Sequence, residues 1–148
     1  MSKDAVLNLI DAMKEQAKTK AYMKAIEEAY EAQAKLEIEL SKQTRDRNTA
    51  LKNLGELEYR EKVLLAYQEE YDQLRYTTGL TDEQRQRMDW LNDEIMDTET
   101  GLEATQYAIK DTSHKVDELN GYVNDTSAEL DEVKQTTKDA ETAFSEYQ

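Results

Sequence analysis

The single histidine is the first residue to consider for chemistry, because imidazole is the side chain that changes charge near neutral pH. His114 falls at an outward-facing position of a predicted helix, with Asp111 three residues before it. Dimetal helical bundles use this spacing, but they need the element twice and this chain has only one histidine. We therefore interpret His114 as a surface residue and predict no metal site.

Paired carboxylates are the second candidate for chemistry. Acidic residues adjoin one another at Glu69–Glu70, Asp93–Glu94 and Asp131–Glu132. Neighbouring residues on a helix point in different directions, and no feature of these segments would bury one acid and raise its pKa. Cysteine is absent, and no phosphate-binding loop, nucleophile elbow or calcium loop occurs. We therefore expect that the protein is not an enzyme, with no catalytic residue and no cofactor.

The composition indicates which elements carry these residues. Hydrophobic residues make up 38% of the 148 residues, charged residues make up 35%, and proline is absent. This fraction of hydrophobic residues is enough for a seam between helices but low for the core of a globular domain. The apolar residues are also regularly spaced, which a disordered chain does not require.

Downstream of Gly79 the apolar residues follow a heptad pattern, with alternating steps of three and four from Met88 to Tyr147. The pattern contains an Asp-Thr or Asp-Ala pair every 14 residues, at 97, 111, 125 and 139. It predicts one helix over 82–147 in which Gly101 and Gly121 lie off the seam. The predicted interface consists of the seam residues Met88, Leu91, Ile95, Leu102, Ile109, Val116, Leu119, Val123, Leu130, Val133 and Phe144.

A tight helix–helix connection is predicted at 78–81. Gly79 suits the left-handed conformation that ends many helices. Thr81 and Gln84 have the spacing of a capping box, which starts the next helix. Trp90 lies near this turn, and we expect it to pack against Tyr71 or Leu74; the alternative is an interface hot spot.

The first segment is predicted as a helix over 3–77, although 41–48 contains no apolar residue. This gap is a polar layer, a hinge or the end of a partner, and we favour a continuous helix because neither glycine nor proline interrupts it. The fold class is therefore all-α, as an elongated antiparallel coiled-coil hairpin forming a single unit over 1–148. The alternatives are a three-helix bundle, with a break near 41–48, and a multichain coiled coil.

The charge is unevenly distributed. Residues 1–60 carry 11 basic and 11 acidic side chains, whereas residues 61–148 carry 8 basic and 22 acidic ones, which accounts for the net charge of −14. Nucleic acid is not expected as a partner, because phosphate contacts need clustered Lys and Arg. No signal peptide or membrane-spanning run is recognisable. We expect a protein partner or self-association through helices, no membrane, and a cytoplasmic or virion-associated location.

Two families share features with the sequence. Segments 80–88 (LTDEQRQRM), 91–95 (LNDEI) and 128–144 (AELDEVKQTTKDAETAF) resemble the coiled-coil portions of phage tail tape-measure proteins. The resemblance implies an extended structural helix in a virion. Segment 64–74 (LLAYQEEYDQL), followed by Gly79, is similar to the hairpin stalk proteins of flagellar and type III secretion export. That resemblance implies contact with a secretion ATPase.

These observations lead to one functional hypothesis with two alternatives. The chain is expected to be a structural or assembly protein that acts as a spacer or scaffold in a phage or phage-like particle. The first alternative is an acidic inhibitor, or DNA mimic, that binds a basic protein cleft. The second is a chaperone or stalk of a secretion ATPase.

Overall fold

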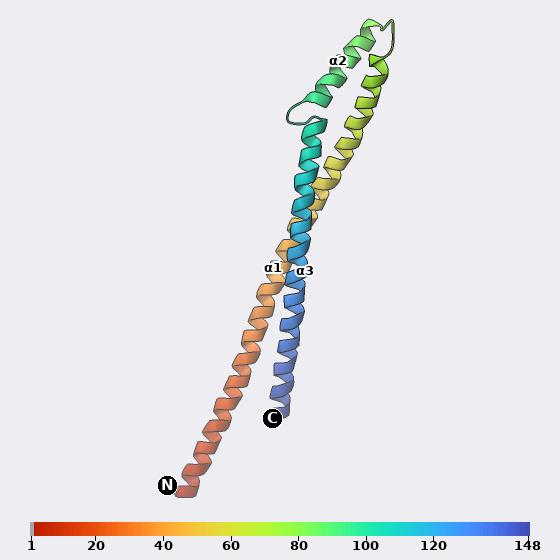
Figure 1. The fold of residues 1–148 in the computed structure, drawn as a ribbon. Helices are drawn as coiled ribbons and strands as arrows, with labels where there is room; N and C mark the ends of the chain where they lie inside the picture. Colours follow the sequence, from red (N-terminus) through yellow and green to blue (C-terminus); the bar gives the residue numbers. More distant parts are fainter. Residues whose placement is uncertain (1) are drawn as a thin grey trace. The chain divides into compact units, whose positions relative to one another are not determined.

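The computed structural model describes residues 2–148, and Figure 1 shows their fold as a ribbon. Helix α1 spans Lys3–Arg75, α2 spans Asp82–Met96 and α3 spans Leu102–Tyr147. No strand occurs among residues 2–148, so the predicted all-α class is confirmed.

Helix α1 is unbroken over its 73 residues. Its N-terminus is capped by Ser2, whose hydroxyl accepts a hydrogen bond from the Ala5 N–H at 3.2 Å. Asp4 in the first turn and Arg75 in the last turn match the helix dipole. The predicted continuous helix through 41–48 is therefore confirmed, and the expected alternative of a break in that segment is not formed.

The turn between α1 and α2 has the predicted caps. Gly79 has φ +69°, in the left-handed region that glycine adopts without a Cβ clash. The Gln84 N–H donates to the Thr81 hydroxyl at 3.1 Å, and the Thr81 N–H donates to Gln84 Oε1 at 2.9 Å. This reciprocal pair is a capping box. Helix α1 ends at Arg75, two residues before its predicted end.

The single helix predicted over 82–147 is wrong at 97–101. Helix α2 ends at Met96, α3 starts at Leu102, and the five residues between them form a loop. The Asp97 carboxylate accepts hydrogen bonds from the N–H groups of Glu99 at 2.8 Å and Thr100 at 2.9 Å. Because Asp can bond its own following backbone, it competes with the helical pattern at this point.

Gly101 makes this loop possible. A Cβ atom at residue 101 would lie 2.3 Å from the Asp97 carbonyl oxygen and 2.5 Å from the Ile95 carbonyl oxygen. Both neighbours are backbone atoms that cannot swing away, so only glycine fits. Gly101 was expected inside a helix, off its seam. In the structure it is buried in the loop.

Contacts between residues divide the chain into two units, which we describe separately; the expected single elongated unit over 1–148 stays a prediction. The first unit contains the chain up to Gln43 together with Tyr122–Gln148. In it the start of α1 pairs with the end of α3, so these segments are antiparallel. The Tyr22 ring lies between Phe144 and Tyr147, with centroids 5.9 and 5.1 Å away.

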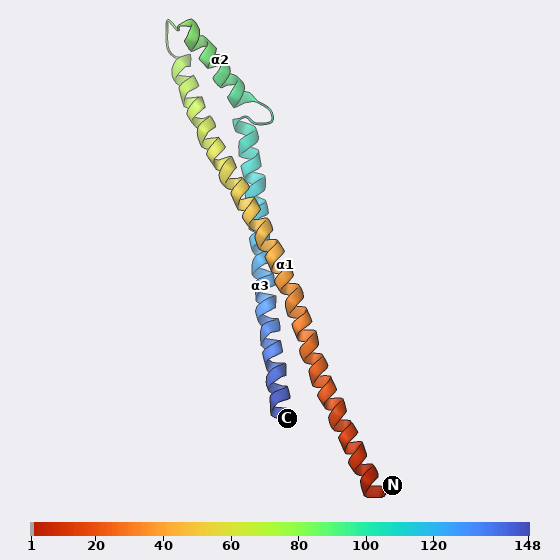
Figure 2. The same cartoon turned by 180° about the vertical axis from the view of Figure 1, so that it is seen from behind.

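The second unit covers Thr44–Gly121. It contains the end of α1, the turn, α2 and the start of α3, and α2 lies beside the end of α1 in both ribbon views (Figures 1 and 2). Leu64 of α1 and Leu91 of α2 are fully buried in this unit. Ala50, Ile95 and Val116 are also buried, which places the apolar core along the line between the helices.

Candidate functional site

The predicted seam residues lie on the packed side of α2 and α3. Leu91, Ile95, Val116, Val123 and Leu130 are buried. The other six are half-buried, and none of the eleven is exposed; these six are Met88, Leu102, Ile109, Leu119, Val133 and Phe144. In the structure these residues are covered by the chain's own helices. Their binding to a separate partner stays a prediction.

Threonine fills part of the α3 seam. Thr105, Thr126 and Thr137 are buried among the apolar residues. The Thr137 hydroxyl donates to the Val133 carbonyl oxygen at 2.9 Å, so this buried hydroxyl is satisfied by its own helix. A seam with threonine at these positions is weaker than one built from leucine, because threonine is a poorer helix former and buries less apolar surface.

Helix α1 contains a matching seam that the sequence did not reveal in full. Buried or half-buried positions alternate by three and four from Thr19 to Tyr71 without a gap. The apolar residues predicted part of it, but polar side chains occupy the remaining positions, which are Thr19, Gln33, Gln43, Arg47, Glu61 and Gln68. Continuing the heptad spacing along the whole helix, whatever the residue type, would have found them.

Two of these polar residues have atoms without a partner. Gln43 Oε1 and Arg47 Nε are shielded from solvent and form no hydrogen bond. An unsatisfied buried polar atom costs about 1–3 kcal/mol. The segment 41–48 is therefore a helical stretch with polar seam positions, which weakens the packing of α1 at that point without interrupting the helix.

Trp90 belongs to a cluster of aromatic and arginine side chains next to the turn. Its ring meets Tyr67 edge-on, with centroids 5.2 Å apart, and the Arg87 guanidinium lies 4.7 Å from the Trp90 ring centre. The aromatic partner of Trp90 is Tyr67, one helical turn from Tyr71. The expected packing of Trp90 against Tyr71 or Leu74 stays a prediction.

Glu70 holds Arg87 in this cluster. Its two carboxylate oxygens accept from Arg87 Nε at 2.8 Å and Nη2 at 2.9 Å. The hydrogen bond from Arg87 lowers the pKa of Glu70, and the same bond raises the pKa of Arg87. Trp90 is 42% exposed, so the cluster presents Trp, Tyr and Arg side chains to solvent, a combination that is enriched at binding hot spots.

The loop 97–101 is attached to α1 by Arg60. The Arg60 Nε donates to the Thr100 carbonyl oxygen at 2.8 Å, and its Nη2 donates to the same oxygen. The Thr100 N–H, then the Glu99 N–H, and more weakly the charge of Arg60 lower the pKa of Asp97. Beside the loop is an open hollow of about 750 Å³, lined by residues that include Gln68, Ile95, Met96, Asp97, Leu102 and Tyr107.

A smaller hollow of about 360 Å³ lies farther along the second unit, lined by residues that include Asp46, Asn53, Thr112 and Lys115.

His114 is exposed. Among residues 2–148, no group of three or more His, Asp or Glu side chains could hold a metal ion. Within the same residues, no helix has the length and apolar character to cross a membrane. The described helices therefore carry an apolar seam and an exposed aromatic–arginine cluster at Trp90.

Comparison with known proteins found no match to this chain among protein-family models, curated proteins or solved structures.

Proposed function

We propose that the protein is a structural coiled-coil protein that serves as a spacer or scaffold through contacts along its helices. The observation that supports this most strongly is the α1 seam, which continues at steps of three and four from Thr19 to Tyr71. A repeated seam of this kind builds length rather than a pocket. At about 1.5 Å per residue, the 73-residue α1 helix is roughly 110 Å long.

We further propose a phage or phage-like particle as the setting. The support is the resemblance of segments 80–88, 91–95 and 128–144 to the coiled coils of tape-measure proteins. In this proposal the protein is cytoplasmic before assembly and virion-associated afterwards.

The experiment that tests this function is purification of particles from the source cells, followed by quantitation of the chain in them. We expect a fixed number of copies in each particle. Val123→Asp places a charge in the buried seam and should remove the chain from particles, whereas Asn124→Asp adds the same group at the exposed neighbouring position and should not. Absence of the wild-type chain from particles would reject the proposal.

A second candidate function is binding to a basic protein cleft as an acidic inhibitor. The observation that favours it is the excess of acidic residues after residue 60, with 22 acidic and 8 basic side chains over 61–148. An inhibitor of this kind should compete with DNA for its target and lose affinity steeply as ionic strength rises. A scaffold whose contacts are apolar should keep its contacts under the same change.

A further inference from the structure

In the second unit, the loop between α2 and α3 takes up more chain than α1 uses on the opposite side. Tyr67 packs against Trp90, and farther from the turn Asn53 and Thr112 line the smaller hollow together. Between these two levels α1 advances 14 residues (67 − 53), whereas the chain through α2, the loop and α3 uses 22 (112 − 90). The side that contains the loop is therefore eight residues longer (22 − 14).

Further contacts in the second unit show that this excess is confined to the region of the loop. The Glu70–Arg87 ion pair lies three residues beyond the first level on both helices. Asp46 and Leu119 line the smaller hollow seven residues beyond the second level, again on both helices. The pairing of α1 with α2 and that of α1 with α3 are each regular, and they differ by eight residues.

An excess of eight residues is close to one heptad. Seven residues of α-helix advance by about 10 Å and fall only about 20° short of two full turns, so they return the same face to a partner helix. The sequence keeps the heptad spacing through the loop, because Ile95, Thr98 and Leu102 have the spacing of consecutive seam residues. The loop therefore interrupts the helix without changing which residues belong to the seam.

The α3 seam tolerates a shift of one heptad. Thr105 and Thr112 are equivalent residues of successive heptads, and the other seam position is aliphatic in five successive heptads, at Leu102, Ile109, Val116, Val123 and Leu130. A shift of seven residues along α1 therefore replaces aliphatic by aliphatic side chains and Thr112 by Thr105. Because the chemical types are retained, nearly the same apolar surface is buried in both alignments.

Few interactions oppose the conversion of the loop into helix. The Asp97 carboxylate accepts from two following N–H groups, and Arg60 donates to the Thr100 carbonyl oxygen. A helix through 97–101 loses these bonds, but it gains backbone hydrogen bonds by propagation from two existing helices, which needs no new nucleus. Only Gly101 in this segment strongly disfavours the helix.

We infer that the loop 97–101 accommodates one extra heptad and that α3 has a second register along α1. In the second register 97–101 is helical, one helix extends over 82–147, and α3 lies about 10 Å farther from the turn along α1. Asn53 then faces Thr105 in place of Thr112, and the pairings of α2 and α3 with α1 agree to within one residue (8 − 7). The wild-type chain holds the first register.

This device does not rest on the proposed scaffold function, since it concerns the pairing of helices within one chain. Particle incorporation can fail while the second register exists, and the reverse also applies. A scaffold with this device presents the contacts of α3 at two levels.

Two substitutions select the two registers. Gly101→Ala excludes the loop, because its Cβ meets backbone oxygens at 2.3 and 2.5 Å, and alanine favours the helix; we expect the second register. Thr98→Pro excludes the continuous helix. It suits the loop, because Asp97 has φ −56° and ψ 128° and caps the turn in which residue 98 is the first position. We expect Thr98→Pro to keep the first register.

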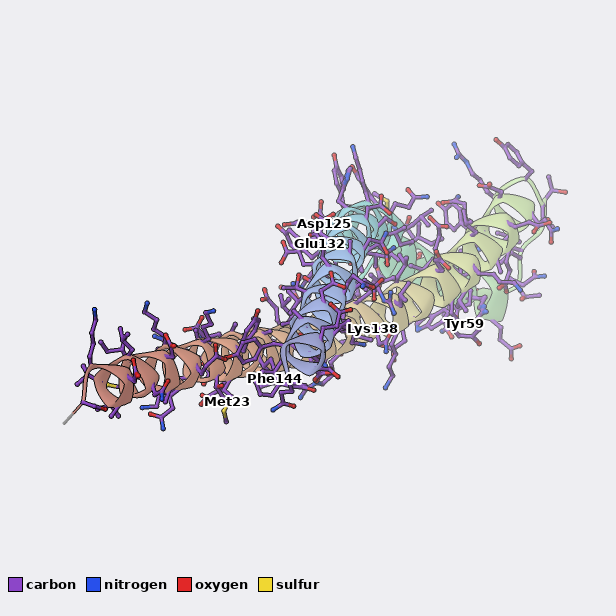
Figure 3. All side chains as sticks on the ribbon, turned by 90° about the horizontal axis from the view of Figure 1, so that it is seen from below. Met23, Tyr59, Asp125, Glu132, Lys138 and Phe144 are labelled. Carbon is purple, nitrogen blue, oxygen red and sulfur yellow. The ribbon has the colours of Figure 1, made fainter. Side chains whose placement is uncertain are left out.

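Pairs of spin labels on introduced cysteines measure the register, since the natural chain has no cysteine. Tyr59 of α1 is 70% exposed and is labelled in Figure 3, and Asp117 of α3 is exposed. In Gly101→Ala the axial separation of labels at 59 and 117 should increase by about 10 Å, and that of labels at 45 and 106 should decrease by the same amount. Labels at 59 and 89, on α1 and α2, form the control pair and should not move.

Deletion of the seven residues 95–101 tests the extra heptad independently. It removes the loop and places Leu102 at the seam position of Ile95. The helix should become continuous with α3 in its wild-type position, so the distance between labels at 59 and 117 should stay unchanged. Deletion of only the five loop residues, 97–101, is the matched control. It rotates α3 by about 140°, which turns the seam away from α1, and should lower the melting temperature below that of the seven-residue deletion.

Three results would overturn the inference. The first is a Gly101→Ala chain whose label distances equal those of the wild-type chain. The second is a Gly101→Ala chain that loses helix by circular dichroism without a shift of α3. The third is a seven-residue deletion that melts as low as the five-residue deletion or that moves the labels at 59 and 117, which would show that the loop does not contain one heptad in excess.

Discussion

Segments 97–101 and 111–115 occupy equivalent places in the 14-residue repeat and yet adopt different structures. Both begin with Asp-Thr, but the first is a loop between α2 and α3, whereas the second lies inside α3. The first continues as Glu-Thr-Gly and the second as Ser-His-Lys. The comparison shows that the repeat sets the positions of seam residues, while a capping Asp, a glycine and one arginine from another helix decide whether the backbone stays helical.

Among substitutions that distinguish the two segments, replacement of the loop glycine should change the free energy of unfolding most. Gly101→Ala places a Cβ against two carbonyl oxygens, so we expect the free energy of unfolding to fall by about 2–3 kcal/mol. Thermal or urea unfolding measures the change.

Gly121→Ala is the control, because a Cβ there meets nothing within 4 Å and the residue is inside α3. It should stabilise the chain by about 0.5–1 kcal/mol. Equal effects of the two substitutions would show that Gly101 is not held in a tight loop.

Removal of the arginine that holds the loop should have the next largest effect. Arg60→Leu deletes the two N–H donors to the Thr100 carbonyl oxygen, and we expect a loss of about 1 kcal/mol. Hydrogen exchange at residues 98–102 should become faster. The exposed Arg45 offers the control: Arg45→Leu should leave exchange in the loop unchanged, and faster exchange there would contradict our account.

The capping aspartate distinguishes the two segments with a smaller effect. Asp97→Ala removes the acceptor for the Glu99 and Thr100 N–H groups and should lower the melting temperature. Asp111→Ala changes the equivalent residue of the next repeat, which is exposed and helical, and should not lower it. If Asp111→Ala is equally destabilising, the loop does not depend on its cap.

The pH dependence of the stabilisation by Asp97 should be the smallest of these effects. The folded state lowers the pKa of Asp97 below its ordinary value of 3.8, so the stabilisation is fully present above that value and is lost as pH falls through the folded pKa. The difference in melting temperature between the wild-type chain and Asp97→Ala should therefore shrink below pH 3.8. A difference that stays constant down to pH 2 would contradict the role of the ionised carboxylate.

Local chemistry made several features predictable. The caps at Gly79, Thr81 and Gln84 depend on residues within six positions of one another, and the structure contains them as predicted. The apolar heptads located the buried side of α2 and α3, because burial follows the spacing of apolar residues along a helix.

Other features required contacts between distant segments. Arg60 and Thr100 are 40 residues apart, and the sequence does not indicate that they meet. The ring contact between Trp90 and Tyr67 was not predicted, because the alignment of two antiparallel helices depends on how they pack. The loop at Asp97 was missed because Asp97 is in register with the helical repeats at 111, 125 and 139. The Thr100-Gly101 pair that follows was a local signal for a loop.

The turn at 76–81 also has a kinetic consequence. Contacts near it join residues close in sequence, with Glu70 and Arg87 only 17 positions apart, whereas Tyr147 and Glu15 are 132 apart. Closing a loop costs roughly 0.6 kcal/mol more for each doubling of its length. The chain should therefore begin to fold at the capped turn and pair progressively towards its two ends, and a substitution that weakens the turn should slow folding more than one near the termini.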